Sequence, residues 1–140
     1  METLRARYRG APNSVREARK AVVDYARMCG FATGELNDIE VAVGEALANA
    51  VEHGTRNLGF ITVTCSFDGS GLVIEIRDDG SGFDHVTGAR RDPRSIRGFG
   101  ISLMRALMDD VRYVARGNVV QLVKTGPKAH AQRAAFEERA

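Results

Sequence analysis

A carboxylate and an amide stand four residues apart in the segment EVAVGEALANAVEHG, which spans residues 40–54. If this segment is helical, Glu45 and Asn49 lie one turn apart on the same face. Periodicity alone favours a solvated polar face opposite an apolar stripe. However, Asn and mid-helix Gly are poor helix formers, so Asn49 and Gly44 suggest that something approaches this face closely. The residues alone leave both interpretations open.

A second group of residues follows a strand in the segment EIRDDGSGFD, residues 75–84. Asp78 continues the apolar face formed by alternate residues of 72–76, so its carboxylate is partly dehydrated and needs hydrogen-bond donors. The exocyclic amino group of a purine is one such donor. Gly80 and Gly82 remove side chains just beyond it, which lets a flat ring come close. A tight turn in which Asp78 binds its own backbone is the alternative.

Two glycines, Gly98 and Gly100, open a predicted helix in the segment RGFGISLMRALMDDVRY, residues 97–113. The free N–H groups and positive dipole end of a helix start suit an anion. Arg94 and Arg97 add positive charge just upstream, although such a glycine pair is also a common helix entry. Neither GxxxxGK[ST] nor a strand-linked GxGxxG is present, which argues against a P-loop or a dinucleotide-binding fold.

The elements that position these residues are predicted from apolar periodicity, which indicates an α+β domain over residues 1–126 and a polar tail over residues 127–140. We expect a capping box at Ser14–Glu17 to start the first helix, whose apolar stripe reaches Met28. We also expect antiparallel hairpins, and hence a two-layer sandwich with a mostly antiparallel sheet and helices on one face. The expected elements are a strand at 2–9, helices at 14–29, 33–53 and 98–111, hairpins at 61–67/72–76 and 112–116/119–124, and a loop at 79–97.

Composition excludes several classes of protein. The chain has 140 residues, of which 44% are hydrophobic and 27% are charged, with a net charge of +2. This balance does not predict direct binding to nucleic acid or to a membrane surface. Two cysteines, Cys29 and Cys65, form no CxxC or Cys/His cluster, which excludes a disulfide scaffold and argues against a zinc site. No apolar run is long enough to span a membrane, and the start lacks the apolar region of a secretory signal, so we expect the cytoplasm.

Taken in order, the three segments resemble the N, G1 and G2 boxes of the GHKL ATPase superfamily. Within it, the chain is most similar to the small serine/threonine kinases that act as bacterial anti-sigma factors and have a histidine-kinase-like ATPase domain. The resemblance extends over roughly residues 3–125. It implies an α/β sandwich that holds ATP, with Mg²⁺, between helices and sheet.

The resemblance also implies roles for single residues at the two ends of the nucleotide. Asp78 would bind the adenine amino group, and Gly80 and Gly82 would shape the adenine pocket. Asn49 would supply an oxygen ligand to Mg²⁺, and Glu45 would act as general base toward a serine or threonine hydroxyl.

The phosphate end and the last hairpin are less well matched. Gly98 and Gly100 would cradle the phosphates with help from Arg97, and residues 83–97 would form the lid. Further candidate lid residues are Arg90, Arg91 and Arg94. Asn118 stands where the family often has Thr, and no histidine-containing dimerisation helix is found before the domain, unlike in a complete sensor histidine kinase.

The function implied by the resemblance is that of an anti-sigma factor with ATP-dependent serine/threonine kinase activity in a partner-switching system. Its partners would be a sigma factor, an anti-sigma factor antagonist of the STAS-domain type, and a second copy of the chain. The strand with Leu4, Ala6 and Tyr8 is the expected dimer contact, because an open edge strand invites pairing. The alternatives are a non-catalytic nucleotide-gated binding module, a switch kinase that releases a signalling complex, and an α+β interaction domain without nucleotide.

Overall fold

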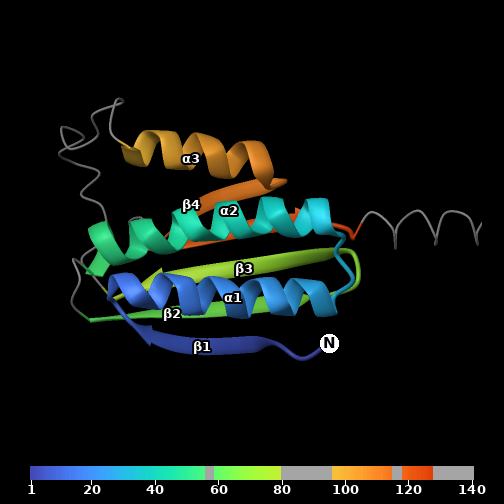
Figure 1. The fold of residues 1–140 in the computed structure, drawn as a ribbon, viewed down its shortest axis with the longest axis horizontal. Helices are drawn as coiled ribbons and strands as arrows, with labels where there is room; N and C mark the ends of the chain where they lie inside the picture. The colour runs from blue at the N-terminus through green and yellow to red at the C-terminus, as the bar shows by residue number, and fades with distance from the viewer. Residues whose placement is uncertain (56–58, 80–95, 115–117, 128–140) are drawn as a thin grey trace, which may run out of the picture.

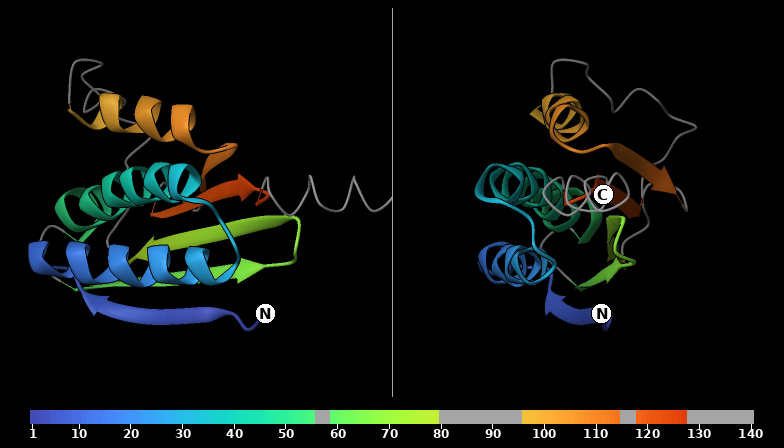
Figure 2. Two further views of the ribbon diagram at one scale, coloured as in Figure 1. Left: turned by 45° about the vertical axis from the view of Figure 1, so that its right-hand side comes forward. Right: turned by 90° about the vertical axis from the view of Figure 1, so that its right-hand side faces the viewer.

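Five antiparallel strands form one sheet, and the helices cover one of its faces (Figures 1 and 2). The computed structural model describes residues 1–55, 59–79, 96–114 and 118–127. The order of strands across the sheet is β1-β2-β3-β5-β4, so the α+β prediction with helices on one face is confirmed. The elements are β1 (Leu4–Arg9), α1 (Pro12–Met28), α2 (Thr33–Asn49), the π-helix η1 (Ala50–Thr55), β2 (Phe60–Phe67), β3 (Gly71–Asp78), α3 (Ile96–Leu107), β4 (Asp110–Val114) and β5 (Val119–Thr125).

Alternation along the strands produces rows of side chains that cross the sheet on its helix-covered face. Two rows are apolar apart from a terminal tyrosine: Leu4–Cys65–Ile74–Leu122–Val111 and Ala6–Val63–Ile76–Val120–Tyr113. A third row, Tyr8–Ile61–Asp78, replaces the expected apolar residue with a carboxylate. The sheet register therefore places Asp78 at the border of the core, as the alternation predicts.

Helix α1 begins earlier than its predicted capping box. Its first residue is Pro12, which has no N–H to satisfy and therefore suits a helix start. Ser14 lies buried inside the helix, and no side chain caps the N-terminus, so the capping-box prediction is wrong. Met28 is 74% exposed, because Tyr25 and Ala26 occupy the inner side of the last turn.

Helix α2 and η1 together cover the predicted helix at 33–53, and the apolar stripe along them, which comprises Leu36, Ile39, Val43, Leu47 and Ala50, is buried. At its start, the Glu35 carboxylate accepts a hydrogen bond from the Ala32 N–H at 3.1 Å. At its end, the chain continues as η1 up to Thr55, whose hydroxyl donates to the Val51 carbonyl at 2.8 Å.

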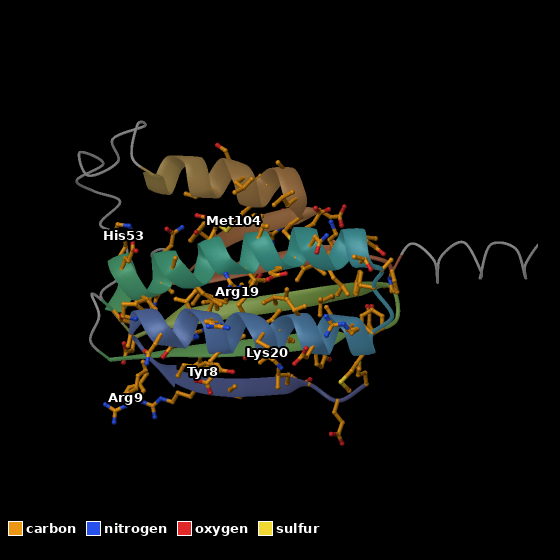
Figure 3. All side chains as sticks on the ribbon, viewed as in Figure 1. Tyr8, Arg9, Arg19, Lys20, His53 and Met104 are labelled. Atoms are coloured by element: carbon orange, nitrogen blue, oxygen red, sulfur yellow. The ribbon has the colours of Figure 1, made fainter. Side chains whose placement is uncertain are left out.

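Helix α3 ends at Leu107, so the prediction of a helix through residue 111 is wrong at its C-terminal end. Val111 is buried as expected, but as a residue of β4. The Lys124 ammonium donates to the Leu107 carbonyl at 2.6 Å and so satisfies a carbonyl of the last turn. Met104 packs between α3 and α2 (Figure 3). The final hairpin is confirmed in β4 and β5; its connection at 115–117 and the predicted tail from residue 128 lie outside the described residues.

Candidate functional site

The Glu45 and Asn49 side chains come from successive turns of α2. Glu45 is half-buried and Asn49, the last residue of α2, is 9% exposed. Within the described part of the chain, the buried Nδ2 of Asn49 has no hydrogen-bond partner. An unpaired buried amide is costly, so this side chain is suited to meeting a polar ligand.

Gly100 of α3 lies directly against these two side chains. A Cβ atom at this position would be 2.9 Å from Oε2 of Glu45 and 3.6 Å from Nδ2 of Asn49. The structure therefore brings together two residues of the second helix and one glycine of the third helix. Arg97 and Gly98 belong to the first turn of α3, and only their backbone is described.

Asp78 ends β3 with its side chain toward the helices, and it is 6% exposed. Its backbone is tied to the neighbouring strand, because the Asp78 N–H donates to the Asn118 carbonyl at 2.9 Å and Nδ2 of Asn118 donates to the Asp78 carbonyl at 3.3 Å. On the other side, a Cβ atom at Gly54 would overlap the Asp78 carboxyl group. Only glycine in η1 leaves room for this carboxylate.

A small cavity joins these groups between α2 and the sheet. Its lining comprises Ala46, Asn49, Ala50, Ile76, Asp78, Tyr113, Asn118 and Val120. Its volume is about 10 Å³, which is room for about one water molecule. The purine-binding candidate Asp78 and the metal-binding candidate Asn49 thus share one cavity, and a purine ring can enter only if its walls move apart.

The single amide oxygen of Asn49 fits a magnesium ion that is held mainly by phosphates. In the described residues, no group of three His, Cys, Asp or Glu side chains could hold a metal ion on its own. Mg²⁺ usually retains several waters and binds one or two protein oxygens together with substrate phosphates. The buried amide of Asn49 can supply one such oxygen.

Several predicted site residues cannot be placed. Gly80 and Gly82 lie outside the described residues, as do the candidate lid residues Arg90, Arg91 and Arg94. Their roles stay predictions.

Sequence reasoning missed three contributions to the site. The predicted helix at 33–53 ends just before Gly54 and gives this residue no role in the site, whereas it makes room for Asp78. Tyr113 lines the cavity because it ends an inner row of the sheet, a position that strand alternation in residues 110–114 could have indicated. Asn118, noted only as a departure from the family, hydrogen-bonds the Asp78 backbone.

The described helices include none that is both long and apolar enough to cross a membrane.

Comparison with known proteins identifies the domain. Residues 8–124 match the family described as Histidine kinase-like ATPase domain. An anti-sigma F factor of Anoxybacillus flavithermus is 30% identical over 125 residues, covering 81% of this chain and 86% of the relative. An anti-sigma F factor of Thermoanaerobacter pseudethanolicus is 29% identical, covering 76% of this chain and 82% of the relative. A serine-protein kinase RsbW of Listeria monocytogenes is 30% identical, covering 81% and 80%.

A solved structure supports the same fold. The crystal structure of RsbU and RsbW domains of a Mycobacterium tuberculosis protein superposes with a TM-score of 0.65 at 21% identity, covering 89% of this chain and 32% of that one. The family match spans the elements that carry Glu45, Asn49, Asp78 and Gly100. This chain therefore belongs to the histidine kinase-like ATPase domain family.

Proposed function

We propose that this chain is an anti-sigma factor that is also an ATP-dependent serine/threonine protein kinase, acting on an anti-sigma factor antagonist. The observation that carries the proposal is the meeting of Glu45, Asn49 and Gly100 at one point between α2 and α3. A base, an oxygen ligand and a close backbone approach are what phosphoryl transfer to a protein hydroxyl requires. The relatives named anti-sigma F factor and serine-protein kinase RsbW support the same function.

At the purine end, the Asp78 carboxylate accepts a hydrogen bond from the adenine amino group. The Asn118 contacts fix the backbone of this residue, and Gly54 fixes the space around its side chain. Gly80 and Gly82 shape the pocket beside the ring. Selectivity for adenine then follows from its exocyclic amino group, which can donate to this buried carboxylate.

At the phosphate end, Glu45 accepts the proton of the substrate serine or threonine hydroxyl while the hydroxyl oxygen forms its bond to the γ-phosphorus. The bond from the γ-phosphorus to the β,γ-bridging oxygen breaks, and ADP leaves with that oxygen. Asn49 offers its amide oxygen to Mg²⁺, which supplies charge neutralisation for the phosphates when it is bound. Gly98 and Gly100 let the backbone of α3 approach the phosphates, and Arg97 adds positive charge there.

The partners follow from this activity. Phosphorylation of the antagonist, a protein of the STAS-domain type, releases it, and the kinase then holds the sigma factor. This exchange takes place in the cytoplasm, where a sigma factor meets RNA polymerase. We also propose that the chain forms a homodimer, which sedimentation velocity would reveal as a mass near twice 15.2 kDa.

The test is transfer of labelled phosphate from ATP to candidate antagonists. Glu45→Ala is expected to abolish transfer and to leave ATP binding within about threefold, because the base acts only in the chemical step. Glu40→Ala is the matched control, since Glu40 is an exposed carboxylate on the same helix. Full-rate transfer by Glu45→Ala would contradict the role of Glu45. Tight ATP binding by the wild type without any phosphorylated partner would instead indicate a non-catalytic binding module.

A further inference from the structure

Strand β1 is an edge strand with one open side. It pairs only with β2, and the views in Figures 1 and 2 show no other described element beyond it. The Gly10 N–H donates to the Gly59 carbonyl at 2.8 Å, in register with the ladder between β1 and β2. In such a ladder, residues that bond the partner strand alternate with residues whose backbone groups point away. Because Gly10 bonds the residue directly opposite it, the even-numbered residues of β1 bond β2. The N–H and C=O groups of Arg5 and Arg7 therefore point toward the open side.

The same strand presents three arginines on the face of the sheet opposite the helices. Arg5, Arg7 and Arg9 are exposed, and their neighbours across the ladder are uncharged residues of β2: Thr64, Thr62 and Phe60. Within the described residues, none of the three pairs with a carboxylate; the Arg7 guanidinium lies 3.9 Å from the centre of the Phe60 ring. Figure 3 shows the Arg9 side chain extending away from the body of the protein.

We propose that the open edge of β1 binds an extended acidic segment of a partner protein, with Glu or Asp at alternate positions, as an additional strand. Alternate residues of a strand repeat every 6.8 Å or so, and the arginines and the carboxylates would share this repeat. Backbone hydrogen bonds to Arg5 and Arg7 would supply affinity, and the charges would select the partner. This docking surface is independent of the proposed kinase activity.

A second copy of the chain is a poorer occupant of this edge. Two copies of β1 that pair antiparallel around a two-fold axis place side chains of the same face opposite each other. The arginines of one copy would then stand against the arginines of the other, which is destabilising. In addition, Leu4 and Tyr8 already pack against the core of their own chain. We therefore expect a homodimer to use a different surface from the strand edge that the sequence suggested.

The test uses a fluorescein-labelled peptide, Thr-Glu-Val-Glu-Val-Glu-Thr, and fluorescence anisotropy with the full chain. We expect saturable binding that weakens about tenfold or more in the double variant Arg5→Glu/Arg7→Glu. The matched control is Arg77→Glu/Arg112→Glu, which changes the same charge on the same face but on β3 and β4, and it should bind within about twofold of wild type. Circular dichroism checks that each variant is folded, and Arg5→Gln/Arg7→Gln replaces the first variant if it is not.

Two further peptides separate strand addition from charge attraction. The first has the same composition with its three Glu in one block, and the second is the alternating peptide N-methylated on the side facing β1. Both should bind at least about tenfold more weakly, because strand addition needs the matching repeat and the backbone hydrogen bonds. Equal binding of all three peptides, or an equal loss in the control variant, would overturn the proposal. So would absence of peptide binding together with a homodimer that Arg5→Glu/Arg7→Glu alters, because that result assigns the edge to a second copy.

Discussion

Replacing Gly54 by Ala tests how η1 supports the purine end of the site. The new Cβ atom would be 2.8 Å from Oδ1 of Asp78 and nearer still to the other two carboxyl atoms, whereas ordinary contact begins at 3.4 Å. The carboxylate must therefore move by more than about 0.6 Å, a displacement that spoils a hydrogen bond whose geometry is tight. Asp78 has little freedom to follow, because its backbone is tied to Asn118.

The magnitude follows from the hydrogen bond that is lost. A hydrogen bond to a charged group contributes about 1.5–3 kcal/mol, which corresponds to an ATP affinity about 10- to 150-fold weaker. Calorimetric titration of ATP into the Gly54→Ala variant measures this loss. Gly34→Ala is the matched control, because among the described residues no atom outside its own helix turn lies within 4 Å of the added Cβ, and it should bind ATP as the wild type does.

Wild-type ATP affinity in folded Gly54→Ala would refute this reasoning. If Asp78→Asn nevertheless weakened binding in the same assay, the carboxylate would bind adenine but the π-helix would not constrain it. If Asp78→Asn also had no effect, the assignment of the purine site itself would be wrong.

Three further substitutions test other contacts. Gly100→Ala pushes against Oε2 of Glu45 by a few tenths of an ångström; phosphate transfer in single-turnover kinetics should fall about tenfold, and an unchanged rate would contradict the contact. Lys124→Met removes the ammonium that binds the last carbonyl of α3, so urea unfolding should show a loss of about 1–3 kcal/mol, and a loss below 0.5 kcal/mol or so would show that water replaces it. Hydrogen bonds from the backbone and then the hydroxyl of Ser70 hold the pKa of Asp68 below its usual range, so this carboxylate stabilises the fold above about pH 4 and the stabilisation is lost as pH falls through its folded pKa. Asp68→Ala should therefore lower the melting temperature at pH 7, and the difference from wild type should shrink as the pH falls through the folded pKa of Asp68; a constant difference would contradict the linkage.

The sheet and the spacing within single segments could be predicted from the sequence. Period-two alternation in residues 61–67 and 72–76 fixes which side chains face the helices, and the structure confirms this as well as the position of Asp78. Helical spacing likewise places Glu45 and Asn49 on one face. These predictions succeed because each depends on one backbone geometry and on residues close in the chain.

Element ends and contacts between segments could not be predicted in the same way. The apolar spacing of Met104, Met108 and Val111 suits a continuing helix, yet α3 ends at Leu107, where the Lys124 ammonium of β5 binds its carbonyl, and Val111 pairs with β5 as part of β4. The contacts of Gly54 with Asp78 and of Gly100 with Glu45 could not be predicted, because the carboxylates that need the small size of these glycines come from other elements. Such contacts depend on tertiary packing, which a local pattern does not contain.

The π-helix η1 links the two ends of the site through its length. Asn49 precedes it and Gly54 lies within it, so the number of residues between them sets how the Asn49 amide and the space for Asp78 are oriented relative to each other along one continuous helix. Each residue of this π-helix turns the chain by a fixed angle, so a single deletion would swing Gly54 away from the carboxylate and bring a bulkier neighbour against it. Homologous or engineered chains should therefore vary in composition across this segment much more readily than in residue number.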